Sequence, residues 1–174
     1  MALDLSKTLV VGISATALFD MNESDQIFRD MFDTDRDVAI DRYRDYMLAH
    51  EDLPLSPGTG FPLVKALLAL NSHLEAGEKS PLVEVVVMSR NSPETGLRVL
   101  NTIRHMKLDI TRSAFTAGES VVDYLDAFDV DLFLTTNVGD AQQVIDSRQC
   151  AAAVVKLPPK EAAQIPEGQV RIAF

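Results

Sequence analysis

The chain has 174 residues, of which 47% are apolar, so it can bury one ordinary hydrophobic core, and we expect one globular domain. Its formal net charge of -10 argues against nucleic acids and anionic membranes as partners, because their binders need a basic surface that displaces counterions from phosphates. A single cysteine, Cys150, excludes an intramolecular disulfide, and the acidic start lacks the charge pattern of a signal peptide. We therefore expect a cytoplasmic location.

Strand and helix patterns alternate along most of the chain. Leu9–Ile13 is short, apolar and β-branched, as in a strand buried on both faces. The next segment, about residues 21–58, has a charged helical pattern and ends in a loop rich in proline and glycine, so we interpret it as a helical insertion. The remaining pattern predicts strands at 83–88, 113–116, 131–135 and 151–156, and helices at 61–74, 93–106, 120–128 and 139–147.

This alternation predicts the fold class. Parallel strands joined by right-handed helical crossovers form a sheet that helices cover on both faces. We therefore expect one three-layer, Rossmann-like α/β domain over residues 1–174, with a mainly parallel sheet and a small helical insertion.

The corner that follows the strand at 83–88 is the best candidate for binding an anion. Ligands of open α/β sheets bind beyond the carboxyl ends of the strands, where the sequence here reads Ser89, Arg90, Asn91, Ser92. Hydroxyl, guanidinium and amide donors followed by a helix N-terminus suit a phosphate or nucleotide. A helix start capped by Ser92, with Pro93 in its first turn, explains the same residues equally well.

The segment after the first strand resembles the start of the haloacid dehalogenase fold, through its ending Leu18-Phe19-Asp20. In that fold one Asp is a covalent nucleophile and a second is the general acid and base, with Mg²⁺ beside the phosphate. The resemblance implies that the first strand lies between the second and the fourth. It places the two Asp positions at Ile13 and Ala15, which can neither attack, bind a metal nor transfer a proton.

Two further positions depart from the same pattern. Glu119 lies where the active fold has a lysine, and Thr135 and Thr136 lie where it has the acids that bind Mg²⁺. We therefore expect no catalytic residue and no metal ligand in this chain. The combination describes a degenerate copy of a phosphatase domain.

Two long segments are more specific. Residues 54–67 and 89–99 look like signatures of the type I cytosolic 5'-nucleotidase family, and the similarity extends over nearly the whole chain. In that family the segment similar to 170–174 runs into an Asp-Gly-Asp motif, so the resemblance implies that 170–174 is the first strand of a second, catalytic half. It also implies Mg²⁺-dependent hydrolysis of nucleoside 5'-monophosphates, with the C-terminal catalytic half as a partner and a homo-oligomer as a further option.

Three functions remain open at this point. The chain is the degenerate N-terminal half of a 5'-nucleotidase whose chemistry resides elsewhere, or a regulatory or assembly module that binds nucleotide without reacting. The third option is a scaffold that covers the catalytic half. Stabilisation by nucleotide without phosphate release would favour the second option, and no stabilisation by any ligand would favour the third.

Overall fold

The computed structural model describes residues 5–75, 77, 78 and 80–156, and within them five parallel strands form one sheet in the order β5-β4-β1-β6-β7. The central position of β1 between β4 and β6 agrees with the expected strand order. The predicted Rossmann-like α/β class is confirmed. The strands are β1 (Leu9–Ile13), β4 (Val83–Ser89), β5 (Arg112–Phe115), β6 (Leu132–Thr135) and β7 (Ala151–Val154).

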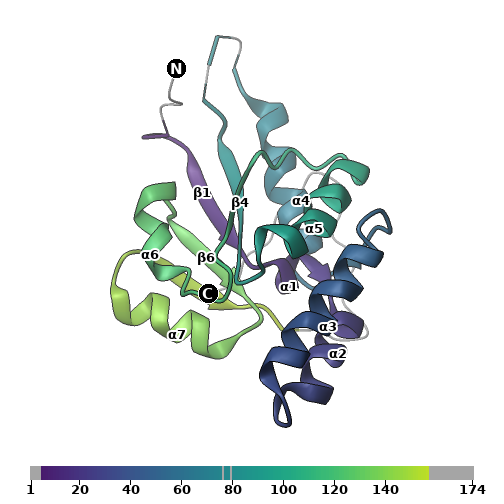
Figure 1. The fold of residues 1–174 in the computed structure, drawn as a ribbon. Coiled ribbons are helices and arrows are strands. Elements are labelled where there is room, and N and C mark those ends of the chain that lie inside the picture. Colours follow the sequence, from purple (N-terminus) through teal and green to yellow (C-terminus); the bar gives the residue numbers. More distant parts are fainter. Residues whose placement is uncertain (1–4, 76, 79, 157–174) are drawn as a thin grey trace.

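Helices cover both faces of this sheet (Figure 1). Val11 and Ile13 of β1 belong to a core with residues of α1, α4 and α5, whereas Val10 belongs to a second core with residues of α6 and α7. This alternation follows from the two-residue period of a strand. The helices are α1 (Ala15–Leu18), α4 (Phe61–Ala69), α5 (Pro93–His105), α6 (Val122–Leu125) and α7 (Val138–Ser147), with the 3-10 helices η1 (Leu70–His73) and η2 (Asp126–Phe128).

A pair of helices, α2 (Asn22–Phe32) and α3 (Arg36–Ala49), extends from the carboxyl end of the sheet (Figure 1). The chain enters and leaves this pair through β2 (Phe19–Asp20) and β3 (Ser56–Pro57), which pair antiparallel. The helical pattern of the insertion is thus divided into two helices. The second begins at the cap residue Asp35, whose carboxylate accepts from the backbone N–H groups of Asp37 and Val38.

The base of the helix pair is fixed to the core by close backbone contacts. The N–H of Gly58 donates to the carbonyl of Leu18 at 2.9 Å, and a Cβ at Gly58 would lie 2.8 Å from the carbonyl oxygen of Ala17. Arg98 of α5 donates from Nε to the carbonyl of Leu53 at 3.0 Å. Only glycine fits at position 58, where the two backbones approach so closely. This explains one of the glycines in the loop.

The structure differs from the predicted elements at several places. The helices expected at 61–74 and 120–128 each consist of a shorter α-helix followed by a 3-10 helix. The segment after β1, for which no helix was predicted, contains the short helix α1, capped by Ser14 through a 3.2 Å hydrogen bond from the N–H of Ala17. The last strand of the sheet ends at Val154, two residues before its predicted end. The strand expected at 170–174 lies outside the described residues.

Candidate functional site

The corner after β4 is held in shape by the neighbouring strand connection. Ser92 caps α5, as expected, because its Oγ accepts from the N–H of Thr95 at 3.3 Å. The loop after β5 donates to this corner, from the N–H of Ala117 to the carbonyl of Asn91 at 3.0 Å and from the N–H of Gly118 to that of Arg90 at 2.7 Å. Both donors have positive φ, of 51° and 97°, which glycine adopts freely at Gly118 but which is unfavourable for Ala117.

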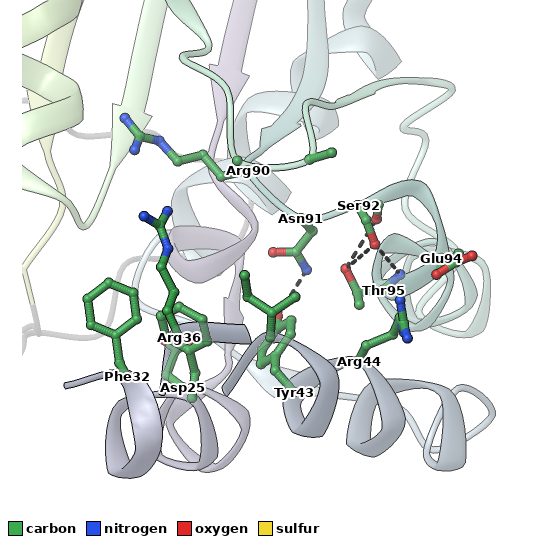
Figure 2. A pocket seen from close by; sticks show the side chains of 14 residues that line it. Asp25, Phe32, Arg36, Tyr43, Arg44, Arg90, Asn91, Ser92, Glu94 and Thr95 are labelled. Carbon is green, nitrogen blue, oxygen red and sulfur yellow. Dashed lines mark hydrogen bonds between the residues drawn. The ribbon is translucent and has the colours of Figure 1, made fainter. Parts of the chain in front are cut away.

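A cavity of about 590 Å³ lies between this corner and the helix pair (Figure 2). One wall comes from the loops after β4 and β5 and the start of α5, and the other comes from one face each of α2 and α3. The two faces follow helical spacing. The lining residues are Arg90, Asn91, Ser92, Glu94, Thr95, Ala117 and Gly118 on the first wall, and Asp25, Phe28, Phe32, Arg36, Ile40, Tyr43 and Arg44 on the second.

Three of the four residues predicted to bind an anion line this pocket, and Ser89 does not. Ser89 is 7% exposed, and its Oγ accepts from the N–H of Asn91 at 3.3 Å. It therefore shapes the corner from within. Arg90, Asn91 and Ser92 present their side chains to the cavity wall.

Tyr43 connects the two walls. Its hydroxyl accepts from the side-chain amide of Asn91 at 3.1 Å, across 48 residues of sequence. Burial, together with the nearby carboxylate of Asp25, raises the pKa of Tyr43 to about 12. The phenol is therefore neutral and remains a hydrogen-bonding group, not a base. This link orients the Asn91 amide at the predicted anion corner.

Arg90 also contacts two residues of α7. Its Nη2 pairs with Oδ1 of Asp140 on α7 at 2.5 Å and donates to Gln143 at 3.4 Å. Burial raises the pKa of the Asp140 carboxyl, and the Arg90 charge lowers it in part. The side chain of Arg90 is 43% exposed and that of Asp140 only 12%, so the arginine is the partner with room to move.

Comparison with known proteins decides the family. A family model described as 5'-nucleotidase matches residues 1–174. This chain belongs to the 5'-nucleotidase family. Human cytosolic 5'-nucleotidase 1B is 28% identical to it over 168 residues, which are 95% of this chain and 26% of the human protein. The chain thus spans about a quarter of the length of that relative.

Membership of the 5'-nucleotidase family implies a divalent metal in general. The resemblance to the haloacid dehalogenase fold would place that metal at the carboxyl ends of β1 and β6. Ile13 and Ala15 are fully buried there. The groups that meet at this edge are hydroxyls: Thr16 Oγ1 lies 2.8 Å from Thr136 Oγ1 and 3.1 Å from Ser14 Oγ. Mg²⁺ prefers carboxylates, so these residues do not fit it.

The other described residues do not offer a metal site either. Within residues 5–75, 77, 78 and 80–156, no group of three or more His, Cys, Asp and Glu side chains is arranged to hold a metal ion. The exposed Glu119 is absent from the lining of the large cavity.

No helix in the same ranges combines the length and apolar character that crossing a bilayer requires.

Sequence reasoning missed most of the second wall. Phe32, Arg36 and Tyr43 were placed in a charged helical insertion, with no role at the site. One signal was available in the spacing of Asp25, Phe28 and Phe32, which puts all three on one helix face. The contact of that face with the corner after β4 depends on how the helix pair docks, which the spacing does not reveal.

Proposed function

We propose that this chain binds nucleoside 5'-monophosphates without hydrolysing them, as the degenerate half of a 5'-nucleotidase whose hydrolytic chemistry resides in a separate catalytic half. The observation that carries the proposal is an excess of arginines in one pocket of an acidic chain, three guanidinium groups against the two carboxylates of Asp25 and Glu94. Despite a formal net charge of -10, three arginines line one cavity, namely Arg36, Arg44 and Arg90. Arginines on two facing walls favour an anion between them.

The phosphate group would lie against Arg90, Asn91 and Ser92. Side-chain donors of two kinds, a guanidinium and an amide, line the pocket there beside the positive N-terminal end of the 13-residue helix α5. Arg44 lies at the opposite end of the pocket from Arg36 and Arg90, beside Ser92 and Thr95 (Figure 2). A phosphate that contacts this corner and either Arg36 or Arg44 would connect α3 to the sheet, in addition to the link between Tyr43 and Asn91.

The family supports the remaining parts of the proposal. Nucleotide hydrolysis is the activity that the family description and the name of the human relative share. We propose that it is Mg²⁺-dependent and takes place in the cytoplasm, with the metal bound by the catalytic half, since the residues described here do not fit Mg²⁺. The catalytic half and a second copy of the chain are the proposed protein partners.

Replacing Arg90 tests the proposal directly. Arg90→Ala should weaken binding of a nucleoside monophosphate by about 10-fold or more, because a hydrogen bond to a charged group contributes roughly 1.5–3 kcal/mol. Isothermal titration calorimetry on the 174-residue chain gives the affinity. Arg104→Ala is the matched control, because Arg104 is an exposed arginine of α5, the helix that follows the Arg90 loop, and does not line the pocket.

Three results decide between the functions. Binding that Arg90→Ala weakens and Arg104→Ala does not supports the pocket as the nucleotide site. Binding that neither variant changes places the ligand elsewhere and contradicts the proposal. No binding of nucleotide or phosphate by the unmodified chain also contradicts it, and then favours a scaffold that covers the catalytic half.

A further inference from the structure

One face of α2 has the apolar side chains of Phe28 and Phe32, with Asp25 beside them, and is not buried by the core. Among the residues of this 11-residue helix, only Ser24 is buried. Phe28 and Phe32 line the pocket, and Phe32 is 39% exposed. An amphipathic helix at a protein surface normally turns its apolar stripe to the core. Here the stripe lines a cavity whose opposite wall carries hydrogen-bond donors.

The exposed rings form an ordered aromatic wall. The ring centroids of Phe28 and Phe32 lie 5.0 Å apart, and Tyr43 contacts Phe28 edge to face at 6.1 Å. The guanidinium of Arg36 lies 5.6 Å from the centroid of the Phe32 ring. Because Asn91 holds the Tyr43 hydroxyl, this wall has a fixed position relative to the anion corner.

The two walls together select one class of ligand. A bare phosphate would make no contact with the aromatic wall, and an apolar ligand would make no use of the charges of Arg36 and Arg90. Aromatic rings bind flat π-systems by stacking, and this holds for every nucleobase because each has a π-face. The cavity of about 590 Å³ is within the ordinary range for small-molecule sites.

We propose that Phe28, Phe32 and Arg36 form a nucleobase subsite, in which the base of a nucleoside 5'-monophosphate stacks on the Phe32 ring while its phosphate contacts Arg90. This inference rests on the proposed function and adds residues of the helix pair to the binding site. Phe32 and Arg36 of the second wall lie at the same end of the pocket as Arg90 of the first wall (Figure 2), so one ligand between the walls can contact all three. Stacking adds affinity for any base and does not by itself distinguish one base from another.

Comparing two ligands separates the subsite from the anion corner. Adenosine 5'-monophosphate and ribose 5-phosphate share the sugar and the phosphate and differ in the base. The unmodified chain should bind the nucleotide about 10-fold more tightly than the sugar phosphate, which is the contribution expected of one stacked base. Phe32→Ala should remove most of that difference and leave ribose 5-phosphate binding unchanged.

A tryptophan variant provides a second, direct measurement. The chain contains no tryptophan, so Phe32→Trp introduces a single fluorescent reporter and keeps an aromatic ring at the site. Its emission should be quenched by adenosine 5'-monophosphate and not by ribose 5-phosphate, and its nucleotide affinity should equal or exceed that of the unmodified chain. Phe32 lies at the exposed end of α2, where replacement leaves the core intact.

Each remaining result overturns the inference. Equal affinities for the two ligands in the unmodified chain, both reduced by Arg90→Ala, would exclude a base subsite while leaving the phosphate site and the proposed function in place. Equal weakening of both ligands by Phe32→Ala would show that the aromatic face only supports the helix pair. If neither ligand binds, the subsite and the proposed function are both wrong.

Discussion

Arg90 has two sets of partners at the residue scale. It contacts Asp140 and Gln143 of α7, and it also lines the cavity that faces α3. A phosphate in the pocket would compete with the Asp140 carboxylate for the same guanidinium. An equilibrium of this kind lowers the apparent affinity for a ligand by the fraction of molecules in which the arginine is available.

Removing the Asp140 charge should therefore strengthen anion binding. We expect Asp140→Asn to raise the affinity for a nucleoside monophosphate by about 3- to 10-fold, because Arg90 is released from its ion pair. Asp146→Asn removes the same charge from α7 at a residue that bonds only to Gln142 in the described contacts, so it serves as the control. Titration calorimetry measures both. Equal gains in the two variants would attribute the effect to net charge and contradict release of Arg90.

The pKa of Asp140 gives this prediction a pH dependence. Burial raises that pKa above its ordinary value of 3.8, so the carboxyl takes up a proton earlier than most aspartates as the pH falls. Protonation of the Asp140 carboxyl removes the charge that attracts the Arg90 guanidinium. The affinity ratio between Asp140→Asn and the unmodified chain should thus be largest near neutral pH and approach one in acid. Taking this ratio at each pH cancels the ionisation of the ligand phosphate.

At the scale of elements, the start of α5 combines two roles. The Ser92 hydroxyl accepts from the N–H of Thr95, and the same residue lines the pocket. The sequence left a capped helix start and a phosphate corner as equal alternatives, and the structure shows the cap. A cap and an anion site make different demands on the side chain, because only the anion site is disturbed by negative charge.

Two substitutions at Ser92 separate these roles. Ser92→Ala should lower the free energy of unfolding by about 1 kcal/mol through loss of the cap, as measured by denaturant unfolding. Ser92→Asp keeps an accepting oxygen at the cap position and should leave stability close to that of the unmodified chain. Its added charge should nevertheless weaken nucleotide binding. If Ser92→Asp binds nucleotide as tightly as the unmodified chain, the phosphate does not lie at this corner.

Elements and their order were largely predictable, whereas contacts between distant elements were not. The strand at Leu9–Ile13 was recognisable because short apolar β-branched runs suit a strand buried on both faces. The bond between Tyr43 and Asn91 spans 48 residues, and the contact of Arg90 with Gln143 spans 53. No local pattern encodes such pairs. The site could therefore be recognised only in the structure, where the helix pair lies over the corner after β4.

At the scale of the whole molecule, the parallel sheet brings the carboxyl ends of β1, β4 and β6 to the same edge. A phosphatase of this type would have its catalytic residues there. Here that edge has hydroxyl groups from Ser14, Thr16 and Thr136. Hydroxyls without an adjacent base are weak nucleophiles and poor magnesium ligands. The described residues at this edge therefore lack the groups that would cleave a nucleotide bound under the proposed function.

We therefore expect the purified 174-residue chain to release no phosphate from nucleoside monophosphates above background, with or without Mg²⁺. Loss of a nucleophile or of its proton-transfer partner reduces rates by orders of magnitude, and such losses within one unit are not independent. The measurement is phosphate release from chain free of host phosphatases, with chelator added as a control for metal dependence.

The choice of comparison variant follows from burial. Restoring aspartates at Ile13 and Ala15 would place two carboxylates at fully buried positions, so that variant would lose stability before it could gain activity. Arg90→Ala is the better comparison, because Arg90 is exposed on the pocket wall. Mg²⁺-dependent turnover that follows the chain through purification and falls in Arg90→Ala would show that this chain is itself a catalyst. That result would overturn its assignment as the non-catalytic half.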